Sequence, residues 1–149
     1  MENEIMEAEQ SMETYALIDD IAKLFGVLVG RAVQNKKMSY GHRKLLKCLS
    51  HGEEMDQLRL IKEANLTSSS VSTELARMEA DGYVCRRFDP ADQRKFLVRI
   101  TDKGMARHRL ISKKSKEIEE MMLNGVDNEE RERLAEVLRI VLENLESSS

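Results

Sequence analysis

The chain has few of the residues that bend or cross-link a protein. Its 149 residues include one proline, two cysteines, no tryptophan, three tyrosines and three phenylalanines, against nine methionines. Two cysteines do not make the disulfide framework of a small secreted domain or a structural zinc site. Methionine, leucine, glutamate, lysine and arginine are good helix formers and proline is not, so the composition favours long helices.

The two cysteines, Cys48 and Cys85, are expected to be small buried apolar residues, because free cysteine is commonly buried. Cys85 also stands beside Arg86 and Arg87, and neighbouring cations can stabilise a reactive thiolate. Redox sensing by Cys85 is therefore the alternative interpretation.

Long apolar runs and catalytic patterns are absent from the sequence too. No run approaches the roughly 20 residues of a membrane-spanning helix, and the acidic start is unlike a signal peptide, so a cytoplasmic protein is expected. We see no metal-spaced cluster of His, Cys and Asp, no nucleotide-binding glycine loop and no Ser-His-Asp pattern. The three histidines, His42, His51 and His108, are scattered. We therefore expect no enzyme, no metal and no cofactor.

Charge is distributed very unevenly along the chain. The net charge is −3 overall, but it is −5 over residues 1–35, +9 over residues 36–116 and −7 over residues 117–149. A basic middle between acidic ends is typical of a module that binds a polyanion while its flanks face elsewhere. Chance clustering of solvated charges is the alternative.

Amphipathic helices are predicted near both ends of the chain. Apolar residues recur at helical spacing over residues 12–34 and again over residues 128–146, whereas residues 1–10 are weakly patterned and are expected to fray. A small core cannot cover both stripes, so pairing with a second copy is expected, with a monomer folded back on itself as the alternative. The predicted dimerisation residues are Ile18, Ile21, Phe25, Leu134, Leu138, Val141, Leu142 and Leu145.

The middle of the chain predicts a helix-turn-helix. Residues suited to the N-cap of three successive helices are Ser39, Asp56 and Thr67. Asn65 tolerates a positive φ and can make the sharp turn between the second and third of these helices. Apolar residues at 71, 75 and 78 would bury one face of the last helix, which Gly82 would end. A helix, a turn of three or four residues and a second helix form this motif.

After Gly82 the apolar period changes from that of a helix to that of a strand. Residues 83–88 and 96–100 predict two strands, joined by a turn-rich segment that holds the proline. A basic hairpin after a helix-turn-helix is a winged helix. The predicted fold is therefore mainly α with a small β-hairpin wing. We place the winged helix-turn-helix in residues 39–102, a dimerisation helix in 1–38, and a linking helix and second dimerisation helix in 103–149.

Several stretches carry a resemblance to a known family. They are Gly41-His-Arg-Lys-Leu-Leu, Leu66-Thr-Ser-Ser-Ser-Val-Ser, Met78-Glu-Ala-Asp-Gly-Tyr-Val-Cys-Arg-Arg and Asp89-Pro-Ala-Asp-Gln-Arg-Lys-Phe-Leu-Val-Arg-Ile-Thr-Asp-Lys-Gly. With them the chain resembles the MarR family of bacterial transcription regulators over about residues 12–146. The last stretch is similar to the family's wing signature, in which Asp92 and Arg94 would shape the loop tip. The chain departs from the family at Thr73, where many members carry a basic residue, and Glu74 follows it.

Short polar side chains at the start of a helix can reach base edges or phosphates in the major groove. We expect Ser69, Ser70, Ser72 and Thr73 near bases and Arg77 on phosphate. Local capping or solvation is the alternative for each serine. By resemblance Arg94 would enter the minor groove, although a salt bridge to Asp92 is its alternative. The candidate DNA-binding residues are Ser68, Ser69, Ser70, Ser72, Thr73, Arg77, Arg86, Arg87, Arg94, Lys95 and Arg43.

The resemblance implies a homodimeric repressor of double-stranded DNA that binds a pseudo-palindromic operator and is released by a small ligand. The ligand would bind where the first, second and fifth helices meet, although simple packing is the alternative for its candidate residues, Met38, Tyr40, His42 and Met105. A winged helix that binds proteins, with DNA affinity lost through Thr73 and Glu74, is the alternative function. The sequence does not identify the operator, the ligand or the sign of regulation.

Overall fold

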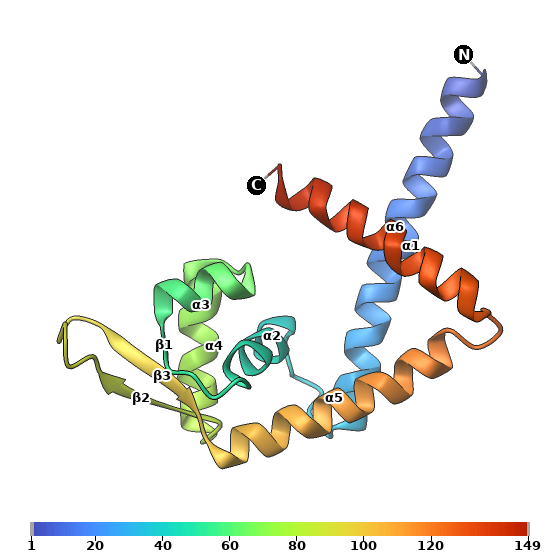
Figure 1. The fold of residues 1–149 in the computed structure, drawn as a ribbon. Coiled ribbons are helices and arrows are strands. Elements are labelled where there is room, and N and C mark those ends of the chain that lie inside the picture. The colour runs from blue at the N-terminus through green and yellow to red at the C-terminus, as the bar shows by residue number, and fades with distance from the viewer. Residues whose placement is uncertain (1, 149) are drawn as a thin grey trace. The chain divides into compact units, whose positions relative to one another are not determined.

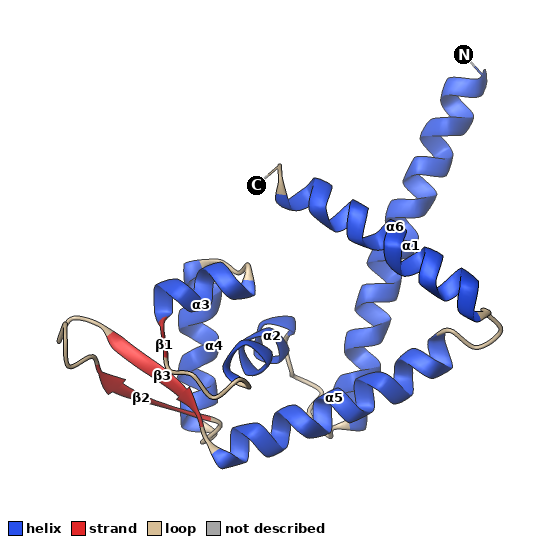
Figure 2. Ribbon diagram, viewed as in Figure 1, coloured by secondary structure: helices blue, strands red, loops and turns tan. Residues whose placement is uncertain are grey.

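The structure, a computed structural model, describes the backbone of residues 2–148; the side chains of residues 2–4 and 7–12 are outside the description. Its elements are α1 (Glu2–Ala32), α2 (Tyr40–Leu49), β1 (Met55–Asp56), α3 (Gln57–Ala64), α4 (Ser68–Ala80), β2 (Val84–Phe88), β3 (Phe96–Ile100), α5 (Asp102–Met122) and α6 (Asn128–Glu146) (Figures 1 and 2). The fold is mainly helical with a small wing, as predicted. It divides into two compact units, residues 1–115 and residues 116–149.

The predicted helix starts are confirmed by their hydrogen bonds. Ser39 Oγ accepts from the backbone N–H of His42 at 2.9 Å and Asp56 Oδ1 accepts from that of Arg59 at 2.8 Å. Thr67 Oγ1 likewise accepts from the backbone N–H three residues on, at 3.2 Å. Each bond satisfies one of the donors that a helix start leaves unpaired.

The turn between α3 and α4 follows the prediction as well. Asn65 has φ 51° and ψ 51°, the left-handed conformation that asparagine tolerates better than most residues. Its backbone N–H closes α3 by bonding the carbonyls of Ile61 and Lys62. The turn therefore depends on local side-chain and backbone chemistry that the sequence displays.

The helix-turn-helix encloses its own core. α2, α3 and α4 pack against one another and against the sheet (Figure 1). The buried apolar residues they contribute are Leu45, Leu46, Leu49, Leu60, Ala64, Val71, Leu75 and Met78. Burying one large apolar side chain stabilises a fold by about 1.5–3 kcal/mol, so this cluster supplies much of the stability of the residue 1–115 unit.

The sheet has three antiparallel strands in the order β1-β3-β2. In the wing, Val84 pairs with Ile100 and Phe88 pairs with Phe96, while β1 adds Met55 opposite Val98. The sequence did not predict β1, because a strand of two residues shows no alternation. The strands 84–88 and 96–100 were predicted, with the first placed one residue too early.

The junction between the wing and α5 needs a glycine. A Cβ atom at Gly104 would collide with the carbonyl oxygen of Tyr83. Thr101 Oγ1 also donates to the carbonyl of Gly82 at 2.6 Å and accepts from the backbone N–H of Gly104 at 3.1 Å. These contacts give the Thr-Asp-Lys-Gly stretch its structural reason: α5 starts tightly against the base of the wing.

Two predictions were wrong. The first helix begins at Glu2 and not near residue 12, because residues 2–10 are helix formers even without an apolar stripe. Cys85 is exposed and not buried: Val84 is buried on one face of β2, and the next side chain points to the other face. Cys48 is partly buried, and burial raises the pKa of its thiol.

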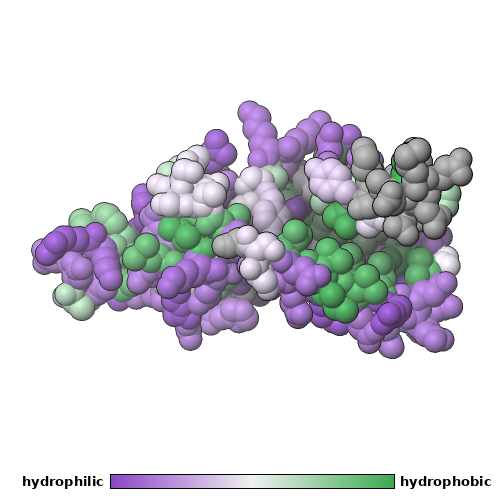
Figure 3. All heavy atoms as spheres, turned by 90° about the horizontal axis from the view of Figure 1, so that it is seen from above, coloured by the Kyte–Doolittle hydropathy of each residue, from purple (hydrophilic) through white to green (hydrophobic). Residues whose placement is uncertain are grey.

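The terminal helices leave apolar side chains at the surface. No residue described in α6 is buried, and Leu134, Val137, Leu138, Ile140, Leu142 and Leu145 are all exposed. In α1 the exposed apolar residues include Leu17, Ile18, Ile21, Leu24 and Val27. Hydrophobic residues therefore reach the surface among hydrophilic ones (Figure 3). None of the helices in the described part of the chain is long and apolar enough to cross a membrane.

Candidate nucleic-acid interface

The first half of α4 presents a polar face to solvent. Ser68, Ser69, Ser70, Ser72 and Thr73 are all exposed. The opposite face buries apolar residues at positions 71, 75 and 78, and this spacing forces the hydroxyl groups outward. Thr67 Oγ1 donates to Ser70 Oγ at 2.8 Å, so one of the predicted contacts is also part of the local cap.

A groove runs between this face and the start of α2. It has a volume of about 440 Å³. Its lining residues are Ser39, Tyr40, Gly41, Leu66, Ser69, Ser70, Thr73, Glu74 and Arg77, and we call it the α2–α4 groove. The helix-turn-helix therefore offers a hollow whose wall carries hydroxyl groups and one arginine.

Glu74 lies on the inner side of this groove and not among the exposed hydroxyl groups of α4. Its side chain is turned into the protein, and the residue is 8% exposed. Oε2 accepts from Ser39 Oγ at 2.8 Å and Oε1 is 3.1 Å from His42 Nδ1. The alternative function predicted that Glu74, with Thr73, weakens DNA binding, and its burial was not predicted. The signal was present, because position 74 falls on the same stripe as Val71 and Met78.

His42 is buried beside Glu74, and burial lowers the pKa of its imidazole, although Glu74 opposes that shift. Its ring meets the ring of Tyr83 edge-on, with 5.5 Å between centroids. The guanidinium of Arg107 lies 5.8 Å from the same Tyr83 ring and donates to the carbonyl of Val33 at 3.0 Å. These contacts link α4, α2, the wing base, α5 and the end of α1 through polar and aromatic groups.

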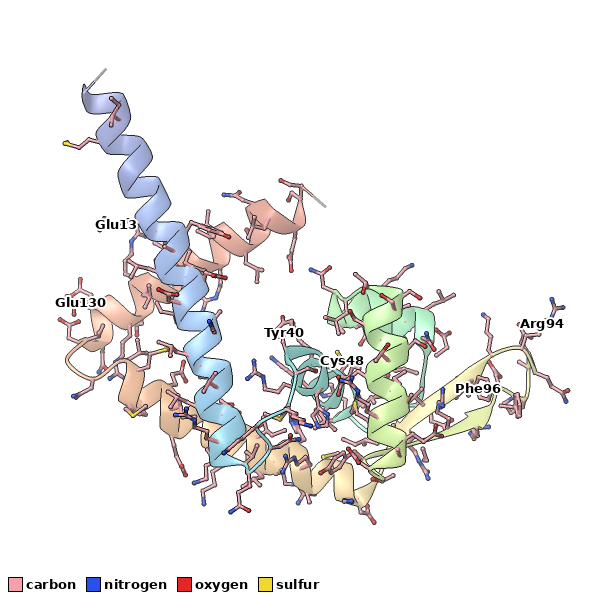
Figure 4. All side chains as sticks on the ribbon, turned by 180° about the vertical axis from the view of Figure 1, so that it is seen from behind. Glu13, Tyr40, Cys48, Arg94, Phe96 and Glu130 are labelled. Carbon is pink, nitrogen blue, oxygen red and sulfur yellow. The ribbon has the colours of Figure 1, made fainter. Side chains whose placement is uncertain are left out.

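The wing tip carries an exposed arginine. Asp92 Oδ1 accepts from the backbone N–H of Arg94 at 3.0 Å and lies 3.9 Å from its Nε. The Arg94 side chain is nevertheless 95% exposed, and it projects from the end of the hairpin (Figure 4). At the base of the loop the rings of Phe88 and Phe96 pack at 4.5 Å between centroids. The aspartate therefore shapes the turn while the cation stays available. Lys95 is exposed beside it.

Arg86 and Arg87 already have acidic partners. Arg86 Nε donates to Glu79 at 2.8 Å, and Arg87 Nε donates to Glu54 at 2.9 Å. The hydrogen bond from Arg87 lowers the pKa of Glu54 and in return raises that of the arginine. A phosphate at either arginine would have to compete with these carboxylates, which the sequence did not reveal.

Arg43 points toward α1. Its guanidinium lies 5.8 Å from the ring centroid of Phe25 and 6.0 Å from that of Tyr40. Burial lowers its pKa, and its Nη1 has no hydrogen-bond partner among the residues that the structure describes. The structure therefore does not bring Arg43 together with the exposed hydroxyl groups of α4.

Two of the four predicted ligand residues line different cavities. Tyr40 lines the α2–α4 groove, whereas Met105 lines a separate opening of about 600 Å³ with Gly52, Arg99, Ile100, Thr101, Asp102 and Arg109. His42 is engaged with Glu74, and Met38 is half-buried in the loop before α2. Within the described residues, no group of three or more His, Cys, Asp or Glu side chains is arranged to hold a metal ion.

The region that holds the α2–α4 groove and most of the wing matches a known family. A family model described as MarR family covers residues 38–96. The chain belongs to the MarR family. This places α2, α3, α4 and β2 inside the part that defines MarR proteins, and Phe96, the first residue of β3, closes the matched segment.

Two curated MarR-like relatives come from Bacillus subtilis (strain 168). An uncharacterised HTH-type transcriptional regulator, YdgJ, is 36% identical over 108 residues, which are 72% of this chain and 66% of that protein. The HTH-type transcriptional repressor YetL is 27% identical over 99 residues, 65% of this chain and 59% of that protein. The chain thus matches somewhat less than two thirds of the length of these two relatives.

A solved structure shows the same fold. BpsR of Bordetella bronchiseptica, described with a mechanism for regulation of its DNA binding by 6-hydroxynicotinic acid, superposes with a TM-score of 0.74. The two proteins share 19% sequence identity, and the match covers 87% of this chain and 98% of that chain. At this identity the likeness establishes the winged helix-turn-helix fold of this MarR-family chain. It does not identify a ligand of this chain.

Proposed function

We propose that this MarR-family protein is a homodimeric repressor that binds double-stranded DNA at a pseudo-palindromic operator and is released by a small ligand. The observation that carries the proposal is the pairing of an exposed hydroxyl face on α4 with the 95% exposed Arg94 at the wing tip. Both features belong to the segment of net charge +9 over residues 36–116. A helix and a basic hairpin on one unit suit the major and minor grooves of a duplex.

The exposed hydroxyl groups would read and position DNA. Short side chains at the start of a helix approach base edges closely, and the free N–H groups of the first turn attract phosphate. Ser69, Ser70, Ser72 and Thr73 are proposed near bases, with Ser68 and Arg77 nearer the backbone. Because Glu74 turns inward, its charge does not face the duplex. This removes one argument for a winged helix that binds only proteins.

Wing residues would add contacts on the flank. Arg94 is proposed in the minor groove, where a narrow groove attracts arginine, and Lys95 is proposed on the backbone. Arg86 and Arg87 would contact phosphate only after exchanging their carboxylate partners. Arg43 is the least favoured of the candidate contacts, since its side chain packs toward α1.

Pairing of two copies through α1 and α6 would complete the DNA-binding unit. The exposed apolar side chains of both helices supply a surface that a second copy can cover. A two-fold pair would set two α4 helices about 34 Å apart, one turn of duplex, and would require a pseudo-palindromic site.

Repression and ligand release rest on fewer observations than DNA binding does. YetL is named as a repressor, and BpsR as a protein whose DNA binding 6-hydroxynicotinic acid regulates. In this chain the candidates for a ligand site divide between the α2–α4 groove, which Tyr40 lines, and the opening lined by Met105. A ligand in the groove would compete directly with DNA, whereas one beside Met105 would act through the start of α5.

Selection from a random duplex pool tests the central claim. Purified protein is expected to enrich a two-fold-symmetric sequence, and affinity for it should fall steeply as salt increases, because phosphate contacts release counterions. Light scattering on the complex should give two chains per site. Absence of any enriched sequence, or enrichment that does not weaken with salt, would refute the DNA-binding proposal.

A further inference from the structure

A buried carboxylate in the middle of a DNA-reading helix needs an explanation. Glu74 is 8% exposed and His42 is 4% exposed, and they come from different helices. Isolated buried charges are strongly unfavourable and persist where hydrogen bonds compensate them. Here both carboxylate oxygens are used, one by Ser39 Oγ at 2.8 Å and the other by His42 Nδ1 at 3.1 Å.

The two donors belong to one rigid unit. Ser39 is the N-cap of α2, and its Oγ accepts from the backbone N–H of His42 at 2.9 Å while donating to Glu74. Two groups at the start of α2 therefore hydrogen-bond both carboxylate oxygens of Glu74 on α4. Apolar packing at Val71 and Leu75 tolerates small rotations of a helix about its axis, whereas paired hydrogen bonds fix a direction.

Rotation of α4 matters for the proposed reading face. Thr73 is adjacent to Glu74 in the chain, and Ser70 lies one helical turn before it, so the fixed carboxylate and the exposed hydroxyl groups rotate as one body. We infer that Glu74 is a positioning residue for sequence reading: with Ser39 and His42 it sets the rotation of α4, and acidification that protonates His42 reduces selectivity for the operator. This inference rests on the proposed function.

The groups around His42 determine how the cluster responds to acid. Glu74 on α4 and Asp81 at the end of α4 favour the imidazolium, while burial and the charge of Arg107 on α5 oppose it. Ser39 and the uncharged Tyr83 ring complete the surroundings. Burial is the largest of these influences and lowers the pKa of His42, so the neutral ring with a proton on Nδ1 fits the hydrogen bond to Glu74.

A second proton would be poorly accommodated. Nε2 of His42 is buried and has no hydrogen-bond partner among the described residues. Protonation there would create a buried N–H without an acceptor, close enough to Arg107 to be repelled by it. The His42 ring or the Glu74 carboxylate must then shift, which would weaken the hydrogen bonds that fix the rotation of α4.

The test replaces Glu74 without leaving a hole. Glu74→Met keeps a similar volume and removes both acceptors and the charge. It leaves the buried Nδ1–H of His42 without an acceptor, so stability should fall while the apolar core of α2, α3 and α4 still folds. Glu63→Met is the matched control, since Glu63 is an exposed carboxylate on α3 that pairs with Arg59. Each variant and the wild type are titrated with a duplex carrying the enriched sequence and with a scrambled duplex.

The measured quantity is the ratio of specific to non-specific affinity at about pH 7.5 and about pH 5.5, the range in which histidine titrates. The wild-type ratio should fall on acidification. Glu74→Met should lower the ratio by about tenfold at the higher pH, the value of one lost base contact, and should show no further fall in acid. Glu63→Met should retain the wild-type ratio and its pH profile.

A second variant separates the ring's titration from its hydrogen bond. His42→Asn retains an N–H donor near the position of Nδ1 but cannot be protonated, so it should keep selectivity at the higher pH and lose the acid response. Circular dichroism at both pH values confirms that each protein is folded. The positioning role is overturned by a Glu74→Met protein that keeps the wild-type ratio of specific to non-specific affinity, whether each affinity is unchanged or both rise by the same factor. Failure of the wild type to select any sequence would instead refute the proposed function.

Discussion

The helix-turn-helix and α6 use apolar residues in opposite ways. In α2, α3 and α4 all the leucines except Leu58, together with Val71 and Met78, are fully buried within one chain. In α6, a helix of 19 residues, none of the described residues is buried, although its apolar spacing is equally regular. An apolar stripe therefore shows which face of a helix is to be buried, but it does not show whether the same chain or a second copy buries it. Four experiments test this difference and the interface that it implies.

Leu142→Glu in α6 is expected to have the largest effect. The side chain is 54% exposed in the single chain, so folding of the monomer should survive. If α6 pairs with a second copy, a buried charge would separate the two chains and operator affinity would fall by about 10²–10⁴-fold, the gain that linked binding normally supplies. Light scattering would measure the mass, with Glu143→Gln as the control. A variant that stays dimeric would contradict the proposed role of α6.

Leu75→Ala tests the self-contained core. Leu75 is fully buried in α4, and its truncation should reduce the free energy of unfolding by about 2–5 kcal/mol through lost contacts and a cavity. Leu58→Ala is the matched control, because Leu58 is 66% exposed and should change stability by less than about 0.5 kcal/mol. Urea denaturation measures both. Equal losses in the two variants would mean that Leu58 is covered in solution.

Arg94→Ala tests the wing without touching either apolar set. We expect operator affinity to fall by about 1–3 kcal/mol and the salt dependence to become shallower, because an exposed cation is lost from the duplex. Arg133→Ala on α6 removes an exposed arginine from outside the wing and should change neither. Fluorescence anisotropy at several salt concentrations gives both quantities. Full affinity in Arg94→Ala would assign that residue to shaping the turn with Asp92.

Acid should destabilise the helix-turn-helix gradually. Burial holds the pKa of His42 below its ordinary value of about 6.5, so the folded state binds fewer protons than the unfolded state as pH falls below that value. Stability from this group is therefore fully present above about pH 6.5 and decreases below it, by at most about 1.4 kcal/mol per pH unit. Urea midpoints across this range measure the slope, and His42→Asn should flatten it. Stability that rises on acidification would reverse the sign.

Local chemistry explains why much of the fold was predictable. Ser39, Asp56 and Thr67 cap their helices through bonds that span three residues, and Asn65 turns the chain by its own conformational tolerance. The wing followed from a change of period. Such features depend on neighbours in the chain, so the sequence displays them. β1 escaped prediction because its two residues form a strand only through their pairing with β3.

The candidate interface was predictable in outline and less so in detail. The exposed serines and Thr73 lie opposite an apolar stripe that the sequence shows, and Arg94 follows from the turn-rich loop. The partners of Arg86, Arg87 and Arg43 were not foreseeable, because Glu79, Glu54 and Phe25 approach them from other elements. The burial of the Glu74 side chain was also not predicted, although position 74 lies on the buried stripe of α4.

The sequence alone predicts the order of the helices and of the two wing strands, the basic middle segment, the polar face of α4 and the family. These depend on periodicity, capping and composition, which act over a few residues. Three features emerge only from the folded chain: the pairing of Arg86 and Arg87 with carboxylates, the exposure of Cys85, and the hydrogen bonds from Ser39 and His42 to Glu74 across more than thirty residues. Hydrogen bonds and burial between distant segments depend on the packing of whole helices, and no local pattern encodes that packing.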